Sequence, residues 1–190
     1  MKSAERRRQV TKMKFRLLLC LLVTCLAVCG TLSGQSKHSH PSEQSSFSAE
    51  EASVKKPVTI PPDVWAILVK DDMVKKMAEN EDPPVEKIPS SWFSASTIHL
   101  SKANLIDYVV MAEPPLAGGN VVTFWVFRDT GHGHDLVMTA PMHDFNVKNT
   151  RHNGYRDIEL DAMTAVTLST VLCRFDGKQY KEYKSKQKDL

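Results

Sequence analysis

The sequence predicts a mainly β fold of the α+β class: an antiparallel meander, sandwich or partial barrel of about seven short strands, with one N-terminal helix packed on it. From Ser91 onward, apolar and polar residues alternate with the period of a strand. Residues 121–127 (VVTFWVF) are rich in β-branched and aromatic side chains, which favour strands. Asn-Gly at 153–154 and Asp-Gly at 176–177 supply the positive φ angles of tight hairpins. Strands and helices do not alternate, which argues against a nucleotide-binding α/β fold.

The predicted strands occupy most of the chain after residue 91. Residues 121–127 place apolar side chains on both sides of the strand, which indicates a central strand with both faces covered. The lysine-rich residues 181–190 are expected to form a frayed end. The other strands are predicted at residues 96–101, 105–111, 136–140, 145–148, 155–160 and 164–175, and a strand resumes at Gln179.

One helix is predicted ahead of the strands. Residues 61–63 (Pro-Pro-Asp) resemble a helix start, because proline suits the first turn and an acid there complements the helix dipole. Apolar residues then recur at helical spacing from Val64 to Met77, with charged residues on the opposite side. The helix should end before Asn80, because residues 81–84 (EDPP) interrupt the pattern.

The N-terminal segment predicts export from the cytoplasm. A basic stretch at residues 6–16 precedes 13 largely apolar residues, 17–29, whereas a membrane-spanning helix needs about 20. Three alternatives stay open: a signal peptide cut before Gly34, a lipoprotein signal in which Cys29 is lipidated, or an uncleaved anchor with a cytoplasmic N-terminus. Each places the rest of the chain outside the cytoplasm, as a periplasmic, cell-envelope-anchored or secreted protein.

The chain therefore divides into three predicted parts. Residues 1–33 form a signal peptide or membrane anchor. Residues 34–60 form a disordered polar linker, because they are rich in Ser, Glu, Gln and Lys and poor in large apolar groups. Residues 61–190 form a single β-rich domain with a basic C-terminal tail.

The charge distribution argues against nucleic-acid binding. The net charge of +3 arises in residues 1–29, which hold seven Lys or Arg and one acid. The remainder holds 18 basic and 21 acidic residues, so the predicted domain is slightly acidic and lacks the positive surface of a nucleic-acid binder. Contact with a membrane is expected only through the N-terminal segment. Beyond that segment the only cysteine is Cys173, which suits a small buried hydrophobe.

The densest cluster of possible metal ligands is His132, His134 and His143, with Asp135 and Asp144 beside them. Imidazole suits Zn²⁺, Cu²⁺ and Ni²⁺, so these histidines are the candidate metal ligands. The alternative is a solvated turn, where histidine and aspartate are ordinary residues beside glycine.

The sequence nominates no catalytic residue and no cofactor. Residues 129–131 (Asp-Thr-Gly) spell the aspartic-protease triplet, but Arg128 precedes them where an apolar residue is expected. Motifs for nucleophilic serine hydrolases, phosphate-binding loops, dinucleotide binding and zinc proteases are missing from the sequence.

Several short segments carry a resemblance: SWF at 91–93 with IHL at 98–100, NVVTFWVFR at 120–128, GYRDI at 154–158, and RFDG at 174–177 with Tyr180. The span from about Ser91 to Tyr183 resembles small exported bacterial β-rich proteins without an assigned activity, which carry a GYRDI strand and an FDGxxY hairpin. The last two segments are also similar to hairpins of FG-GAP repeats and of periplasmic lysozyme inhibitors. The Asp-rich calcium loop of FG-GAP repeats is missing, so calcium does not carry over. The resemblance implies a bacterial exported β-domain and supplies no catalytic residues.

These observations lead to one expected function and one alternative. We expect an exported, envelope-associated, non-catalytic module that binds an unknown protein or glycan. The alternative is a hydrolase or metal-dependent enzyme that uses the region from His132 to Asp144.

Arg156 has two possible roles. By strand alternation it shares a face with Ile158 and Leu160. An arginine there can lay its stem along the core and pair with a carboxylate at the rim, for which Asp176 is the candidate. The other interpretation makes Arg156 a ligand contact, since arginine recognises carboxylates and phosphates. The first interpretation is favoured.

Overall fold

The structure is a computed structural model that describes residues 43–101 and 104–190. The predicted signal or anchor, with Cys29, and residues 34–42 of the predicted linker lie outside the described residues. Within the described part, neither helix has the length and apolar composition needed to cross a membrane.

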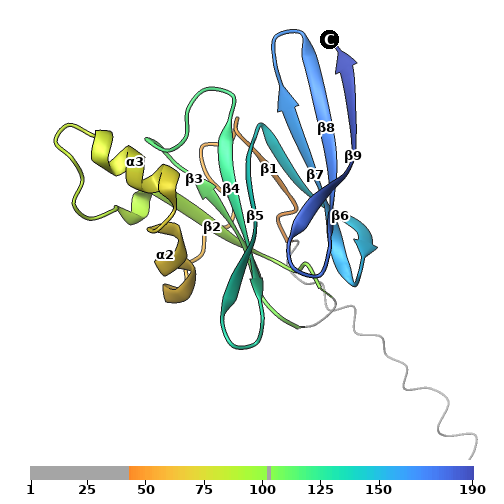
Figure 1. The fold of residues 1–190 in the computed structure, drawn as a ribbon, viewed down its shortest axis with the longest axis horizontal. Helices are drawn as coiled ribbons and strands as arrows, with labels where there is room; N and C mark the ends of the chain where they lie inside the picture. The colour runs from red at the N-terminus through yellow and green to blue at the C-terminus, as the bar shows by residue number, and fades with distance from the viewer. Residues whose placement is uncertain (1–42, 102–103) are drawn as a thin grey trace, which may run out of the picture. The chain divides into compact units, whose positions relative to one another are not determined.

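The predicted mainly β fold of the α+β class is confirmed (Figure 1). The described residues form nine strands, where about seven were expected, and two α-helices, where one was expected. The strands are β1 (Ser46–Ser48), β2 (Phe93–Ile98), β3 (Asp107–Ala112), β4 (Val122–Asp129), β5 (His134–Met142), β6 (Asp144–His152), β7 (Tyr155–Met163), β8 (Thr167–Phe175) and β9 (Tyr180–Asp189). The helices are α2 (Pro62–Leu68) and α3 (Asp72–Asn80), and a short 3₁₀ helix, η1 (Ser90–Trp92), precedes β2.

The strands build two open antiparallel sheets that pack on each other. One sheet has four strands in the order β2-β3-β4-β5, and the other has five in the order β1-β6-β7-β8-β9. Phe124 of β4 lies between them, with its ring centroid 6.5 Å from Phe47 of β1 and 5.3 Å from Phe145 of β6. All three rings are fully buried, so this aromatic cluster is the centre of the core between the sheets.

The turns that the sequence predicted close two hairpins of the five-stranded sheet. Asn153 and Gly154 have positive φ angles between β6 and β7, and Gly177 has one between β8 and β9. Such angles suit the right-handed twist of the flanking strands. The turn chemistry therefore sets the order of these strands.

The two helices lie against the four-stranded sheet (Figure 1). Trp65 of α2 packs edge-on against Phe93 of β2, and Phe93 packs in the same way against Trp125 of β4. The indole nitrogen of Trp125 donates to Asp71 Oδ2 at 3.0 Å. Both faces of β4 are thus covered, and residues 122–127 are all buried, which confirms the predicted central strand except at Val121, which precedes β4 and is exposed.

The single predicted helix is divided because Asp71 caps a second helix. Asp71 Oδ1 accepts from the backbone N–H of Met73 at 2.9 Å and of Val74 at 3.4 Å. An aspartate at this position satisfies amides that a helix start leaves unpaired. The other oxygen of Asp71 accepts the hydrogen bond from Trp125, so the residue between the helices also attaches them to the sheet.

The prediction of a disordered linker is wrong for residues 43–60. Residues 46–48 form β1, which pairs antiparallel with residues 144–146 of β6. Phe47 and Val54 are buried in the core. The polar composition of the segment does not indicate this order. Two buried apolar side chains are enough to order the segment when they pack into a core that the rest of the chain forms.

The prediction of a frayed C-terminal end is also wrong. Residues 180–189 form β9, which pairs with β8 from Phe175↔Tyr180 to Thr167↔Asp189. Only Tyr180 of this strand is buried. β9 is held by backbone pairing to β8, and its exposed lysines are typical of an edge strand that does not pair further.

Candidate functional site

The three candidate metal ligands lie at different places around β5. His132 is exposed in the turn between β4 and β5, and His134 is the first residue of β5. The backbone N–H of His134 donates to Asp63 Oδ2 at 2.9 Å, and its Nδ1 lies 2.8 Å from the same oxygen. This side-chain contact holds the pKa of Asp63 below its ordinary value. Gly133 permits the approach, because it has a φ of 140° and a Cβ there would lie 3.2 Å from Asp63 Oδ2.

His143 has a different environment, in the short connection from β5 to β6. Its Nδ1 lies 3.1 Å from Asp144 Oδ2, and its Nε2 lies 3.9 Å from Glu50 Oε1. The structure thus gives His134 and His143 separate carboxylate partners and does not bring the three histidines together. Within residues 43–101 and 104–190, no group of three or more His, Cys, Asp or Glu side chains is arranged to hold a metal ion.

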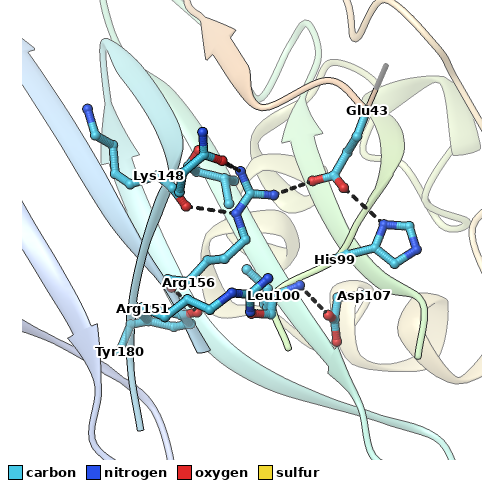
Figure 2. A network of polar contacts seen from close by, with 10 residues as sticks. Glu43, His99, Leu100, Asp107, Lys148, Arg151, Arg156 and Tyr180 are labelled. Carbon is cyan, nitrogen blue, oxygen red and sulfur yellow. Dashed lines mark hydrogen bonds and ion pairs between the residues drawn. The ribbon is translucent and has the colours of Figure 1, made fainter. Parts of the chain in front are cut away.

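Arg156 is the centre of a polar network at the start of β7 (Figure 2). Its Nη1 donates to Glu43 Oε1 at 2.8 Å, and its Nε and Nη2 donate to the carbonyls of Lys148 at 2.7 Å and Val147 at 3.0 Å. The other oxygen of Glu43 lies 2.9 Å from His99 Nδ1. The Arg156 side chain is 11% exposed. Its donors are directed at the protein itself, which favours the structural role over the ligand contact.

The carboxylate partner of Arg156 differs from the one predicted. Asp176 instead pairs with Lys181 at 2.8 Å, and this contact, with two backbone N–H groups, holds the pKa of Asp176 below its ordinary value. The sequence did not indicate Glu43 as the partner, because Glu43 belongs to the segment that was expected to be disordered.

The remaining groups of Figure 2 hold the ends of the two sheets together. Leu100 accepts from the backbone N–H of Arg156 at 2.8 Å and donates its own N–H to Asp107 Oδ2 at 2.7 Å. The other Asp107 oxygen accepts from the N–H of Asp129 at 2.9 Å, and burial raises the pKa of Asp107. The Tyr180 hydroxyl donates to the carbonyl of Arg156 at 2.7 Å, and burial raises its pKa. These contacts join segments distant in sequence, so the network serves the fold.

Cys173 is also a structural residue. Its thiol is buried on the core side of β8, as expected for a small hydrophobe. Burial raises its pKa to about 11, so the thiol stays protonated at neutral pH and is a poor nucleophile.

The outer face of the five-stranded sheet is the candidate functional surface, because no helix or strand of the described residues lies against it (Figure 1). The register places its side chains. On β7, Ile158 and Leu160 point into the core, so the residues between them point outward. Their neighbours on β8 and β9 follow from the strand pairing. The outer face comprises Asp157, Glu159 and Asp161 on β7, Leu168, Thr170, Leu172 and Arg174 on β8, and Lys184, Lys186 and Lys188 on β9.

The acidic side chains of this face are already engaged. Each lies on β7, and each interacts with a hydroxyl or ammonium group of a neighbouring strand. Such hydrogen bonds stabilise the ionised carboxylates in the middle of the sheet. The partners are Thr150 for Asp157 (2.8 Å), Lys148 for Glu159 (2.9 Å) and Thr170 for Asp161 (2.6 Å).

Three basic side chains of the same face, all on β9, form no ion pair in the part of the chain that the structure describes. Lys184, Lys186 and Lys188, which we call the lysine row, pair across the ladder with Leu172, Thr170 and Leu168. All three lysines are exposed, and none forms an ion pair within the described residues. The row therefore presents uncompensated positive charge along the edge of the sheet.

An aromatic group lies at one end of the lysine row. The register of β8 and β9 shifts between Leu172 and Cys173, and Tyr183 is the extra residue on β9. The guanidinium carbon of Arg174 lies 3.5 Å from the centroid of the Tyr183 ring, which is a close cation–π contact. The Tyr183 side chain remains 58% exposed. Two buried atoms close to this contact, Asp157 Oδ1 and Arg174 Nε, form no hydrogen bond within the described residues.

A sequence signal for this surface was present in residues 180–189. Lysines at every second position place their side chains on one face if the segment is a strand. The polar composition of the segment, which offers no apolar alternation, instead predicts a frayed end. The alternate lysines form a row on one face only because the segment pairs with β8 as a strand.

No family model matches this chain, and no curated protein and no solved structure matches it either.

Proposed function

We propose that this chain is an exported, envelope-associated, non-catalytic module that binds a protein or a glycan on the outer face of its five-stranded sheet. The observation that carries the proposal is the lysine row, whose three ammonium groups have no ion-pair partner within the described residues. The acids on β7 each contact a side chain of a neighbouring strand, whereas among the described residues the three lysines of β9 form no ion pair. Charged side chains that the fold does not use favour an external ligand.

A non-catalytic role is supported by the state of the titratable groups. Three of the groups with shifted pKa values are committed to the fold: Asp63 to His134, Asp107 to two backbone amides, and the Tyr180 hydroxyl to a backbone carbonyl. An active site usually places such groups together in a cleft. Here Asp107 and Tyr180 belong to the network that joins the sheets, and Asp63 contacts His134 elsewhere.

The binding proposal is tested by charge reversal on the purified full chain. We expect Lys184→Glu, Lys186→Glu and Lys188→Glu together to abolish binding to arrays of envelope glycans and proteins. The matched control carries Lys75→Glu, Lys76→Glu and Lys87→Glu, which change the net charge equally on the side of the helices. Equal binding by the reversed variant and the wild type would contradict the proposed surface. Chemical change of the bound ligand, detected by mass spectrometry, would show catalysis instead.

The proposed export is tested with a reporter enzyme that is active only outside the cytoplasm. The reporter belongs after Ser42, because residues 43–60 form part of the folded domain. We expect an active fusion, and an inactive fusion that stays in the cytoplasm would contradict export. Replacing Cys29 by serine separates the modes of attachment, since it would release a lipoprotein and leave an uncleaved anchor in place.

A further inference from the structure

We infer that the ligand of the outer face is a linear anionic polysaccharide, carrying carboxylate or phosphate groups, whose chain lies along β9. The inference rests on the proposed function, because it names the class of ligand for the same surface. It is carried by the geometry of the lysine row, the distribution of charge around it, and the exposed Tyr183 at its end.

The lysine row is linear and regularly spaced. Lys184, Lys186 and Lys188 occupy alternate positions of one strand, so successive side chains are separated by about 6.7 Å along it. The row thus extends over about 13 Å. An extended polymer that carries anions at regular intervals can contact all three ammonium groups at once. The flexible stem of lysine lets each ammonium group adjust to the spacing of the polymer.

The positive charge of the row is not cancelled by its neighbours. Glu182 and Asp189 on β9 pair across the ladder with Cys173 and Thr167, positions on the opposite face from the row. Glu159 and Asp161 lie on β7, two strands and therefore about 9.6 Å away, which exceeds the screening length of about 8 Å at physiological ionic strength. An anion close to β9 therefore experiences mainly the lysines.

The surface beside the row suits the apolar faces of sugar rings. Leu168 and Leu172 lie next to the lysines on β8 and are only partly buried. At the end of the row, the Tyr183 ring contacts Arg174 and stacks near the His152 ring, 6.4 Å away, and 58% of its side chain remains exposed. Charged groups along a line, with aliphatic and aromatic carbon next to them, match a polymer whose anionic groups and C–H faces alternate.

A protein partner fits these features less well. Lysine is depleted in the buried centres of protein interfaces, where tyrosine, tryptophan and arginine predominate. The outer face instead presents strongly hydrated ammonium groups, which suit a wet and extended contact. A second copy of the chain would bring three further lysines against the first three.

A lipid surface would use only one end of this face. Met163 at the end of β7 and Val166 in the turn to β8 are exposed at the same end of the sheet as Lys188. A bilayer that receives this turn would reach the nearest lysine, whereas Lys184 and Tyr183 lie further down the strand. A ligand that lies along β9 contacts the whole row.

The test compares dextrans that differ only in charge. We expect the full chain to bind carboxymethyl-dextran or dextran phosphate and not unmodified dextran, with affinity falling roughly tenfold as salt rises from about 50 to about 200 mM. Changing the three lysines of the row to glutamine should weaken binding at least about tenfold, because the ion contacts disappear. Changing Lys75, Lys76 and Lys87 to glutamine should leave binding unchanged, and Tyr183→Ala should weaken it at constant salt dependence. The melting temperature of each variant shows that it is folded.

The other outcomes overturn the inference in distinguishable ways. Binding to phosphatidylglycerol vesicles but to neither anionic dextran would assign the row to a lipid surface. Binding to a neutral glycan or a protein that charge reversal abolishes, without binding to the anionic dextrans, would overturn the inference and leave the proposed function standing. Failure to bind any array component, dextran or vesicle would overturn both.

Discussion

The two sheets of this domain differ in how many of their faces the protein itself covers. In the four-stranded sheet, α2 and α3 cover one face and the five-stranded sheet covers the other, and residues 122–127 are all buried. In the five-stranded sheet only the inner face is covered, and β9 buries a single residue, Tyr180. This difference means that the side chains of β4 stabilise the fold, whereas those of β9 are available to another molecule.

The largest effect is expected where this comparison places the core. Phe124→Ala should lower the free energy of unfolding by about 3–5 kcal/mol, because it empties the space between Phe47 and Phe145. Denaturant unfolding measures the change. Leu172→Ala on the outer face should cost about 1 kcal/mol or less. Equal losses at the two positions would break the distinction between the sheets.

Phe47→Ala asks whether residues 43–60 belong to the five-stranded sheet. Phe47 is fully buried and contacts both Phe124 and Phe145, so the variant should lose about 3 kcal/mol of stability. Val58→Ala, in the same segment but 36% exposed, is the matched control and should change stability by less than about 0.5 kcal/mol. If Phe47→Ala leaves the melting temperature unchanged, the segment does not contribute to the core and is a free linker.

Arg156→Ala should have an intermediate effect, about 1–3 kcal/mol, because Glu43 and two carbonyls lose their donor. A double-mutant cycle sharpens the assignment. Arg156 and Glu43 should be strongly coupled, whereas Arg156 and Asp176 should be additive within about 0.5 kcal/mol. The reverse pattern would restore Asp176 as the partner.

The smallest effect concerns the contact that joins α2 to β5. The folded pKa of Asp63 is lowered by His134, so the stabilisation is present above the ordinary pKa of aspartate, about 3.9, and is lost as pH falls through the folded value. Asp63→Asn should therefore be less stable than the wild type at pH 5, by no more than about 1 kcal/mol because the group is partly exposed. The difference should shrink towards pH 2, and a constant difference would contradict this origin.

Local sequence patterns predicted the parts of the fold that depend on local chemistry. The apolar pattern of residues 121–127 identified the central strand, and Asn153-Gly154 identified a hairpin, since both depend on neighbouring residues. The partner of Arg156 is 113 residues away, and no local pattern reports it. β1 and the greater part of β9, beyond the strand start predicted at Gln179, were missed for a related reason: each is an edge strand that is ordered by pairing with a neighbouring strand.

The site could be predicted only in part. The histidines at 132, 134 and 143 suggested a common site because they are close in sequence, but a turn and a strand separate them in space. The lysine spacing at 184, 186 and 188 was visible in the sequence, yet it acquires meaning only on a strand. Regularly spaced residues share one surface only if the backbone that carries them has the matching conformation, here an extended strand.

The network around Glu43 also has a mechanical consequence. A pull transmitted through residues 1–42 enters the described part of the chain at Glu43, three residues ahead of β1. β1 pairs with β6 over three residues only, so a load applied directly to it would peel it away and draw Phe47 out of the core. The ion pair between Glu43 and Arg156 connects the chain ahead of β1 directly to the longer strand β7. Glu43 thus provides an attachment to the five-stranded sheet that does not depend on the short pairing of β1 with β6.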